Sequence, residues 1–496
     1  IHSTARNCHP ITRTTEVFFI RKGELMKEFY DVAVIGGGVV GCSVFNKLIR
    51  LGKSVVLIDK AADVATGASK ANSGLIHAGY DPAPNTLKAK LNVEGSKLYP
   101  SICKRLSVPL KTVGALVVGD DIEKIKNLHE RGITNGVEGL SILSRKELLK
   151  IIPDLQEHIT CGLQAKTAAL ISPYYFTISI CDEGILNGGE VYLEQDIKSV
   201  KKEKEYFVIK TENNVFKVKN VVNSAGAGYN DVAKLLGSES YDIKFARGEY
   251  FVFSKTSTTK VPCTIFPLPT AKGKGVLLTP TVDGNYLVGP TSIESDDRTV
   301  TTDAGLNEIK EKAKLILKDV NFKNAIREFS GIRTICGDDF IIEKSKKKKG
   351  VVNLAGICSP GLSSAPAIAN MVAKLLGYNE EERKNLKKLK PYKMFKDMTQ
   401  EEQQKVLKKD KNYGQVVCKC EKITRGDIIQ ALNRPLKIRS VDGVKRRTNA
   451  GMGICQGGFC FTKVVNLIKE QRKIRYEDVL KENRGSEVAL GDIREV

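Results

Sequence analysis

The chain contains no tryptophan, and aromatic residues make up only 6% of it. Nucleic-acid-binding surfaces gather basic residues on one helix or face and interleave them with aromatic side chains. The net charge of this chain is +22, but the excess is scattered lysine, and no basic helix with interleaved aromatics occurs. We therefore expect a lysine-rich solvated surface and no nucleic-acid partner. A charge of this size still attracts acidic substrates or an anionic membrane surface.

Long apolar runs are also absent. No stretch of about 18 apolar residues occurs, so the sequence predicts no transmembrane segment. Peripheral contact with an anionic membrane surface stays open because of the positive charge. The 12 cysteines are spread singly over most of the chain, which is typical of a reducing compartment. These features predict a cytoplasmic protein.

Residues 1–25 lack the pattern of a folded core. Arg, Ser and Thr are frequent there, and no acidic residue precedes Glu16, which is typical of an organellar presequence. The alternative is an upstream extension read into the chain, with Met26 as the working start. We expect a non-core extension over residues 1–25, and organellar targeting stays open.

The 496 residues are too many for one simple core, and the 43 glycines are typical of an α/β protein. Residues 31–60 form a strand, a glycine turn, an amphipathic helix and a second strand, and their continuous β-branched runs predict a parallel sheet covered on both faces. Residues 240–343 carry short β-rich runs between Gly and Pro turns, which predicts an inserted, largely antiparallel sheet. The first pattern returns at 351–376. The predicted fold class is α/β: a doubly wound, Rossmann-like domain with this insertion.

The last part of the chain differs in composition. Residues 377–414 are polar, lysine-rich and weakly helical, which predicts a linker or a segment that wraps the surface. Residues 415–496 hold four of the cysteines. We expect them to form a separate, small, α-rich module.

A dinucleotide-binding fingerprint follows the first strand. Gly36, Gly38 and Gly41 form G-x-G-x-x-G between a strand and a helix. Glycine permits the tight turn, the close approach to a pyrophosphate and the packing of helix on strand, and the helix start offers N–H donors to phosphates. Asp59 ends the second strand, where an acid accepts ribose hydroxyls. The motif therefore predicts a bound dinucleotide.

Three later segments favour FAD over NAD. The small-residue loop at 65–80 has the length to lie along a pyrophosphate and reach a flavin ring. Residues 220–233 and 353–370 each run from a strand into small residues and then a helix. Neither is typical of a second NAD site, and both are consistent with backbone approaching one long cofactor.

These segments resemble the FAD-dependent oxidoreductases of the D-amino-acid-oxidase superfamily over roughly residues 27–376. Within it, the chain is similar to the anaerobic glycerol-3-phosphate dehydrogenases and the L-2-hydroxyglutarate oxidases. The resemblance implies FAD as the cofactor and a substrate domain formed mainly by residues 240–343. It also implies a set of flavin contacts beyond the fingerprint: Ser69, Asn72, Ser73, Ile197, Ala225, Gly226, Gly356, Gly361 and Leu362.

Three residues are candidates for the substrate side. Of the five histidines, only His77 lies in the flavin-loop motif, where a base or substrate-positioning role and a structural hydrogen-bonded role are both open. Arg333 takes the place at which the superfamily sets an arginine against a carboxylate or phosphate, and its planar fork suits either anion. Arg247, before a strand of the inserted sheet, is the second candidate. For both arginines the alternative is a surface or interdomain ion pair.

Cys418 and Cys420 form C-x-C, and Cys455 and Cys460 form C-x-x-x-x-C in a glycine-rich stretch. Four thiolates suit a structural zinc or an iron–sulfur cluster. Zinc sites favour C-x-x-C knuckles, so this spacing favours a 2Fe–2S centre over zinc. The module also resembles the [2Fe–2S] domains related to bacterioferritin-associated ferredoxin. The basic residues at 445–447 either dock an acidic partner or lie in a solvated turn.

The resemblance implies an FAD-dependent dehydrogenase that oxidises a small anionic 2-hydroxy substrate. We expect sn-glycerol 3-phosphate as substrate and dihydroxyacetone phosphate as product, with electrons passing through the cluster to a protein acceptor or partner flavoprotein subunit. L-2-hydroxyglutarate or an amino acid as substrate is one alternative. Another is an electron-transfer or assembly subunit that has no substrate of its own.

Overall fold

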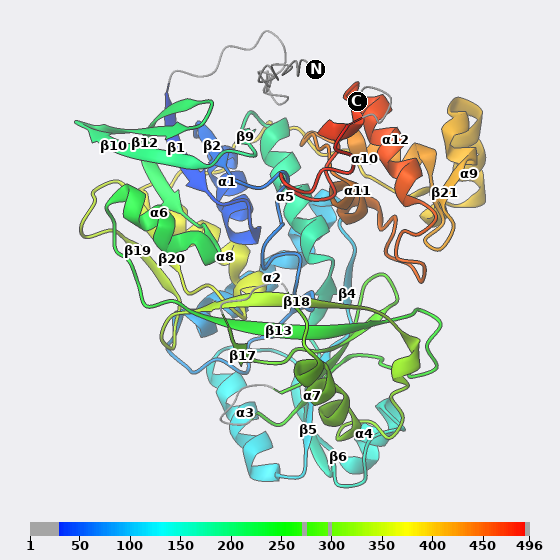
Figure 1. Cartoon of the computed structure of the whole chain (residues 1–496). Coiled ribbons are helices and arrows are strands. Elements are labelled where there is room, and N and C mark those ends of the chain that lie inside the picture. Colours follow the sequence, from blue (N-terminus) through cyan, green and yellow to red (C-terminus); the bar gives the residue numbers. More distant parts are fainter. Residues whose placement is uncertain (1–28, 270–274, 296–299, 492–496) are drawn as a thin grey trace, which may run out of the picture.

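A computed structural model describes residues 29–269, 275–295 and 300–491, and the extension expected at residues 1–25 lies outside them. Figure 1 shows two sheets, one above the other, with the C-terminal segments at the side of the upper sheet. The upper sheet contains the N-terminal strand, and the lower sheet contains the two longest strands. This arrangement confirms the predicted fold class.

The upper sheet has eight strands in the order β10-β11-β12-β1-β2-β9, with β20 beside β12 and β19 beside β20. The contacts β12–β1, β1–β2, β2–β9 and β12–β20 are parallel, and the others are antiparallel. The strands are β1 (Tyr30–Ile35), β2 (Val55–Ile58), β9 (Glu190–Tyr192), β10 (Ile197–Glu203), β11 (Tyr206–Thr211), β12 (Val215–Asn223), β19 (Ile341–Lys344) and β20 (Val351–Ala355).

Both faces of this sheet are covered. Val32 and Val34 belong to a core with α1, α2, α5 and α8, whereas Ala33 and Ile35 point into a second core that includes residues of the β11–β12 hairpin and Leu236. Because side chains alternate along a strand, a continuous apolar run fills both cores at once. The helices are α1 (Val39–Arg50), α2 (Leu87–Leu106), α5 (Pro173–Leu186), α6 (Tyr229–Leu236) and α8 (Gly361–Leu375).

The lower sheet has nine strands in the order β17-β13-β16-β15-β14-β5-β7-β6, with β18 on the other edge of β13. All neighbours are antiparallel except β14 and β5. Its strands are β5 (Ala115–Gly119), β6 (Leu140–Ser144), β7 (Cys161–Ala165), β13 (Lys244–Phe253), β14 (Thr264–Pro267), β15 (Leu277–Pro280), β16 (Tyr286–Gly289), β17 (Ile293–Glu294) and β18 (Ala325–Ile335).

This sheet extends beyond the stretch 240–343. Three of its strands, β5 to β7, come from the first third of the chain, and β19, within the predicted stretch, joins the upper sheet instead. The helices α3 (Ile122–Thr134), α4 (Arg145–Ile151) and α7 (Asp303–Lys314) lie around it, and a small third sheet joins β3 (Leu75–Ile76), β8 (Ala169–Ile171) and β4 (Leu110–Thr112).

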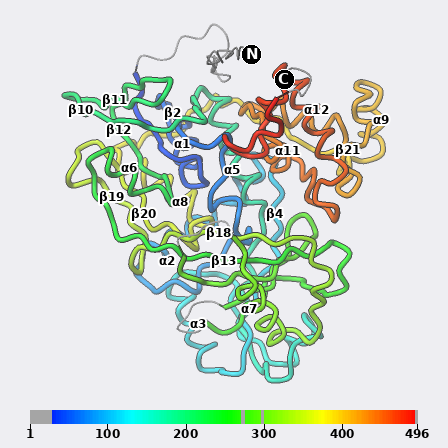
Figure 2. Tube along the Cα trace, in the orientation of Figure 1, coloured from blue at the N-terminus to red at the C-terminus, as the bar shows by residue number. Residues whose placement is uncertain are grey.

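The C-terminal segments form their own hydrophobic core, which includes Cys418, Cys460, Val444 and Ile468. Before them, α9 (Gln400–Lys409) follows a stretch without long helices or strands. The elements of the module are β21 (Val416–Cys418), β22 (Ile423–Thr424), α10 (Arg425–Leu432), α11 (Val441–Thr448) and α12 (Phe461–Arg472). Figure 2 shows the orange and red trace of this module beside α5, although α5 lies far from the module in the sequence. No helix among the described residues is long and apolar enough to span a membrane.

Candidate active site

The glycine turn between β1 and α1 has the close contacts that its motif requires. Gly36 has a φ of +106°, and a Cβ on it would lie 2.5 Å from the Ser224 carbonyl oxygen at the end of β12. A Cβ on Gly41 would collide with the Gly36 carbonyl oxygen. At Gly38 the nearest atom to an added Cβ is the Ser69 hydroxyl oxygen, at 3.3 Å. Glycine is therefore required at the first and third positions by contacts within the chain itself.

Asp59 lies directly behind this turn. The Gly37 N–H donates to Asp59 Oδ2 at 2.5 Å, and the Ala61 N–H donates to Oδ1 at 2.7 Å. Burial raises the pKa of Asp59, while these backbone N–H groups oppose the rise. The acid at the end of β2 thus fixes the glycine turn.

The loop after Asp59 returns to the start of α1. Ser69 Oγ accepts the N–H of Val39 at 2.9 Å, so this hydroxyl lies at the helix start. Asn72 folds back on the loop: its amide donates to the Ala68 and Ser69 carbonyls, and its carbonyl oxygen accepts the Gly74 N–H at 2.9 Å. Asn72 therefore stabilises the loop, and Ser73 is half-buried beside it.

The other predicted flavin contacts gather at the carboxyl ends of the parallel strands, where ligands of open α/β sheets bind. Ala225 and Gly226 follow β12, Gly356 follows β20 with a φ of +65°, and Gly361 and Leu362 begin α8. Ile197 starts β10 and packs against the core that holds Ile35 and Ile58. The fold thus brings all these segments to one edge of the upper sheet.

Arg333 and Arg247 lie on opposite faces of the lower sheet. In the β13–β18 pair, Arg333 is opposite Ala246 and Arg247 is opposite Ile332. Side chains alternate along a strand, so Arg333 shares its face with Gly331. A Cβ on Gly331 would collide with the carbonyl oxygen of Ala71. This face, with Arg333, therefore touches the flavin loop.

The two arginines have different hydrogen-bond and ion-pair partners. Arg333 donates from both terminal nitrogens to the Thr291 carbonyl oxygen at 3.2 Å. Arg247 is buried and its Nε lies 2.9 Å from Oε1 of the fully buried Glu249. Glu249 also accepts the N–H and hydroxyl of Thr302 ahead of α7. Arg247 therefore lies in a buried ion pair on the face away from the flavin loop.

Tyr250 is a neighbour of Arg333 that the motifs did not single out. It lies on the same face of β13, is buried, and its ring stacks on Phe329 with centroids 4.7 Å apart. Burial raises the pKa of Tyr250, and the adjacent Arg333 opposes that rise. The sequence RGEY, which ends in Tyr250, could have indicated this neighbour. Once β13 is paired with β18, strand alternation places Tyr250 on the same face as Arg333.

His77 follows β3, and its backbone is held by hydrogen bonds from two sides. Its N–H donates to Ser363 Oγ in α8 at 2.8 Å, and its carbonyl accepts from Asn92 Nδ2 in α2 at 2.7 Å. The half-buried ring lies 6.0 Å from the ring of Phe266 in β14. Thus His77 is placed between the upper and lower sheets, at the end of the flavin loop.

The predicted cysteines meet in the C-terminal module. Cys420 Sγ lies 3.5 Å from Cys455 Sγ. Cys418 and Cys460 share the hydrophobic core of the module, and burial together with Cys418 raises the pKa of Cys460 to about 12. Among the described residues no three His, Cys, Asp or Glu side chains already converge as ligands of a single ion. The four thiols are thus neighbouring pairs.

The glycine-rich loop fits a sulfur-bound group. Backbone N–H groups of Gly457 and Phe459, together with the Cys420 thiol, lower the pKa of Cys455 and favour its thiolate. A Cβ on Gly453 would collide with Cβ of Cys420, so only glycine allows the two segments to approach. Donors aimed at a thiolate are suited to an iron–sulfur cluster.

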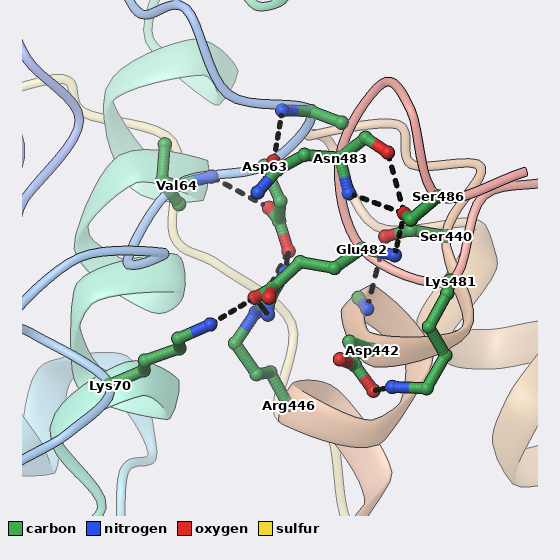
Figure 3. Close-up of polar contacts among 12 residues, drawn as sticks. Asp63, Val64, Lys70, Ser440, Asp442, Arg446, Lys481, Glu482, Asn483 and Ser486 are labelled. Atoms are coloured by element: carbon green, nitrogen blue, oxygen red, sulfur yellow. Dashed lines mark hydrogen bonds and ion pairs between the residues drawn. The ribbon is translucent and has the colours of Figure 1, made fainter. Parts of the chain in front are cut away.

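The basic run 445–447 does not form a free docking patch. Arg446 and Arg447 are 4% and 2% exposed, and both bind Asp63 in the loop after β2. Both alternatives, contact with an acidic partner and a solvated turn, are therefore wrong for these two arginines, because docking of the module on the FAD loop buries them. Figure 3 shows Arg446 at Asp63.

Comparisons with known proteins agree with this geometry. Residues 31–375 match the sequence model described as FAD dependent oxidoreductase, and residues 416–470 match that of the BFD-like [2Fe-2S] binding domain. The chain is 39% identical to a glycerol 3-phosphate dehydrogenase of Caloramator mitchellensis over 93% of this chain and 98% of the relative. It is 28% identical to the mitochondrial L-2-hydroxyglutarate dehydrogenase of Arabidopsis thaliana, over 70% and 84%.

Among solved structures, the L-alpha-glycerophosphate oxidase of Mycoplasma pneumoniae with FAD bound is similar, with a TM-score of 0.69 and 31% identity. The match covers 72% of this chain and 97% of that one. The FAD-dependent oxidoreductase model spans well over half of the chain. The chain therefore belongs to the FAD-dependent oxidoreductases of the D-amino-acid-oxidase superfamily, with FAD as cofactor and a C-terminal BFD-like domain for a [2Fe–2S] cluster.

Proposed function

We propose that the protein oxidises sn-glycerol 3-phosphate to dihydroxyacetone phosphate and passes the electrons through the cluster to a separate protein. The observation that supports this most directly is the position of Arg333 on the face of the lower sheet that contacts the flavin loop. A fixed guanidinium at that place suits an anionic substrate. The full-length similarity to a glycerol 3-phosphate dehydrogenase, cluster domain included, favours phosphate over carboxylate as the anion.

Each residue then has a definite task. Gly36, Gly38 and Gly41 bring the chain to the FAD pyrophosphate, and Asp59 accepts from the ribose. FAD supplies the hydride acceptor for the oxidised carbon. Arg333 pairs with the substrate phosphate, and the His77 side chain takes or positions the hydroxyl proton. Arg247 has no role in this assignment, because it forms an ion pair with Glu249 on the face of the lower sheet away from the flavin loop.

The substrate is tested by anaerobic bleaching of the flavin. We expect sn-glycerol 3-phosphate to bleach the bound FAD, and L-2-hydroxyglutarate and amino acids to leave it oxidised. If L-2-hydroxyglutarate or an amino acid bleaches the flavin and sn-glycerol 3-phosphate does not, that compound is the substrate instead. If none of the compounds bleaches the flavin, the protein is an electron-transfer or assembly subunit.

The cluster ligands we propose are Cys418, Cys420, Cys455 and Cys460, and the surface beside them suits a protein acceptor. Ile454 and Phe459, in the same loop as Cys455, are 70% and 84% exposed. Exposed lysines adjoin the cysteines at 419, 422 and 463. The nearby carboxylate of Glu421 is buried and paired with two lysines, so it does not offset this charge. An apolar centre with a cationic rim fits an acidic one-electron carrier.

The acceptor surface is tested with an acidic ferredoxin and the variant Phe459→Ser. We expect slower reduction of the ferredoxin and unchanged bleaching of the flavin by substrate. Added salt should slow the wild-type reaction, because screening weakens attraction between opposite charges. Equal ferredoxin reduction by variant and wild type would place the acceptor elsewhere.

A further inference from the structure

The carboxylate of Asp63 is the centre of the contact between the C-terminal module and the FAD loop. Asp63 lies between Asp59 and Ser69 in the sequence and is 0% exposed. Arg447 donates to both of its oxygens, at 2.7 and 3.0 Å. Arg446 donates to Oδ2 from Nη2 at 2.9 Å. Two guanidinium groups of α11 thus enclose one acid of the FAD loop.

The contact continues along the loop, as Figure 3 shows. Glu482 binds Arg446 at 3.0 Å and also pairs with Lys70, at the far end of the loop. The side chain of Asn483 accepts the N–H of Ala62 at 3.0 Å. We call the charged residues Asp63, Lys70, Arg446, Arg447 and Glu482 the Asp63 network.

The opposite side of the same loop contacts the glycine turn. The Ala65 N–H donates to the Gly37 carbonyl oxygen at 2.9 Å, and Ser69 Oγ accepts the Val39 N–H. Residues 61–70 are therefore a thin layer between the dinucleotide turn and the C-terminal module. A dinucleotide bound at the turn depends on the placement of this layer.

The charges make the contact specific in its geometry. The two arginines are almost fully buried, so each needs the Asp63 carboxylate at one position to offset the loss of water. Together they depress the pKa of Asp63 against the opposing effect of burial. An apolar contact tolerates sliding, whereas these hydrogen-bonded charges fix the loop in one register.

We propose that Arg446 and Arg447 are positioning residues for FAD: through Asp63 they hold residues 61–70 against the glycine turn, and this direct hold on the loop slows the release of FAD. Two sites that stabilise one arrangement are coupled, and the coupling is reciprocal. FAD binding therefore holds the cluster domain in place, and the docked domain slows the release of FAD. The electron donor and the cluster domain remain together as a result.

The variant Arg447→Met tests this with little risk to folding. With Arg447 removed, the two acids and two bases that remain in the Asp63 network cancel in charge, and Met fills much of the volume. We expect FAD to dissociate about fivefold faster or more, measured as recovery of free-flavin fluorescence from the cluster-loaded protein. Amide hydrogen exchange should rise in residues 61–70. Lys70→Met, at the half-exposed end of the network, should show a smaller change in the same direction.

The chain offers a matched control. Arg434 binds Asp182 of α5 at 2.6 Å, and both are as buried as the Asp63 pair, in the same interdomain contact but away from the FAD loop. Arg434→Met should lower the melting temperature and leave the FAD release rate unchanged. Equal acceleration of FAD release in Arg434→Met, or no acceleration in Arg447→Met and Lys70→Met, would overturn the proposal. Because release of FAD is measured without substrate, the result is independent of which compound the enzyme oxidises.

Discussion

Neighbouring residues of one strand pair have different tasks here because strand alternation sends them to opposite faces. Arg333 and Ala246 share one face, and Arg247 with Glu249 lies on the other. The first arginine reaches the side of the flavin loop, and the second is neutralised beneath α7. The same residue type thus has a proposed substrate role in one place and a structural role in the other.

The same substitution at both arginines distinguishes these roles. Arg333→Lys keeps the charge but loses the planar fork, so kcat/KM for an anionic substrate should fall by about 10²-fold. Arg247→Lys keeps its ion pair with Glu249 and should change the melting temperature more than the kinetics. Steady-state kinetics and thermal unfolding of both variants provide the comparison. Unchanged kinetics in Arg333→Lys would place the anion site elsewhere.

The second glycine of the fingerprint allows a test of FAD binding. Gly38→Val places a branched side chain where the pyrophosphate must approach, so the purified variant should lack FAD. Gly67 provides the control, because an added Cβ there meets nothing within 4 Å. Gly67→Ala should keep its flavin, measured by absorbance after purification. Full flavin occupancy in Gly38→Val would contradict the assigned site.

At the scale of elements, the loop from Gly451 to Cys460 joins two helices and presents two of the cysteines. Its glycines serve different purposes: Gly451 and Gly457 have φ values of +84° and +95°, whereas Gly453 makes room for Cys420. Cys418 and Cys460 belong to the hydrophobic core of the module, while Cys420 and Cys455 lie outside it. The cluster ligands we propose thus combine a buried pair with a more accessible one.

This difference predicts the effect of removing one thiol. Cys455→Ser should remove the visible absorption of iron and sulfide but leave the module folded and FAD in place, because the core lacks Cys455. Bleaching of the flavin by substrate should persist and transfer to a protein acceptor should fail. Gly453→Val should also lower cluster content, by displacing Cys420. About one zinc and no labile sulfide in protein purified without air would show a structural metal site instead.

At the scale of the whole molecule, the C-terminal module touches both sheets. Besides the Asp63 network, Asn449 donates to Asp283 at 2.8 Å, and Arg327 of β18 donates to Gln456 at 2.9 Å. Lys255, which follows β13, pairs with Glu421 beside Cys420. The module therefore bridges the FAD domain and the substrate domain, so that the cysteines are fixed relative to both.

Docking should depend on pH with a definite sign. The charged groups near Asp63 include Arg446, Arg447, Glu482, Lys70 and the more distant Asp59, and the arginines depress its pKa. A depressed acid stabilises the folded chain above its unfolded pKa of about 3.9 and loses that contribution as pH falls through the lower folded value. FAD release and proteolysis at 377–414 should thus be nearly constant from about pH 7 to 5 and rise below about 4. In the variant Asp63→Asn, FAD release and proteolysis at 377–414 should both be fast at every pH. If FAD release and proteolysis in the wild-type protein instead increased around neutral pH, a role for Asp63 would be contradicted.

The sequence by itself determined the features that depend on local spacing. Three glycines in a strand-turn-helix context predict the turn, and continuous apolar strands predict a sheet covered on both faces. The fold class followed from such patterns, since each reflects a short stretch of backbone with few allowed conformations. The family followed from the resemblance that these motifs carry, and the two cofactors from the motifs and that resemblance together. The ligand and catalytic residues stay predictions.

Tertiary structure alone decided which distant segments meet. Pairing of β14 with β5 joins residues 264–267 to 115–118, and no local pattern records such a partner. The face of Arg247 depended on the register of β13 with β18, because a slip of one residue reverses every side chain. The sequence left Arg446 and Arg447 as either docking residues for an acidic partner or part of a solvated turn, since charge alone does not show burial. They are buried because Asp63, far away in the chain, offsets their loss of water.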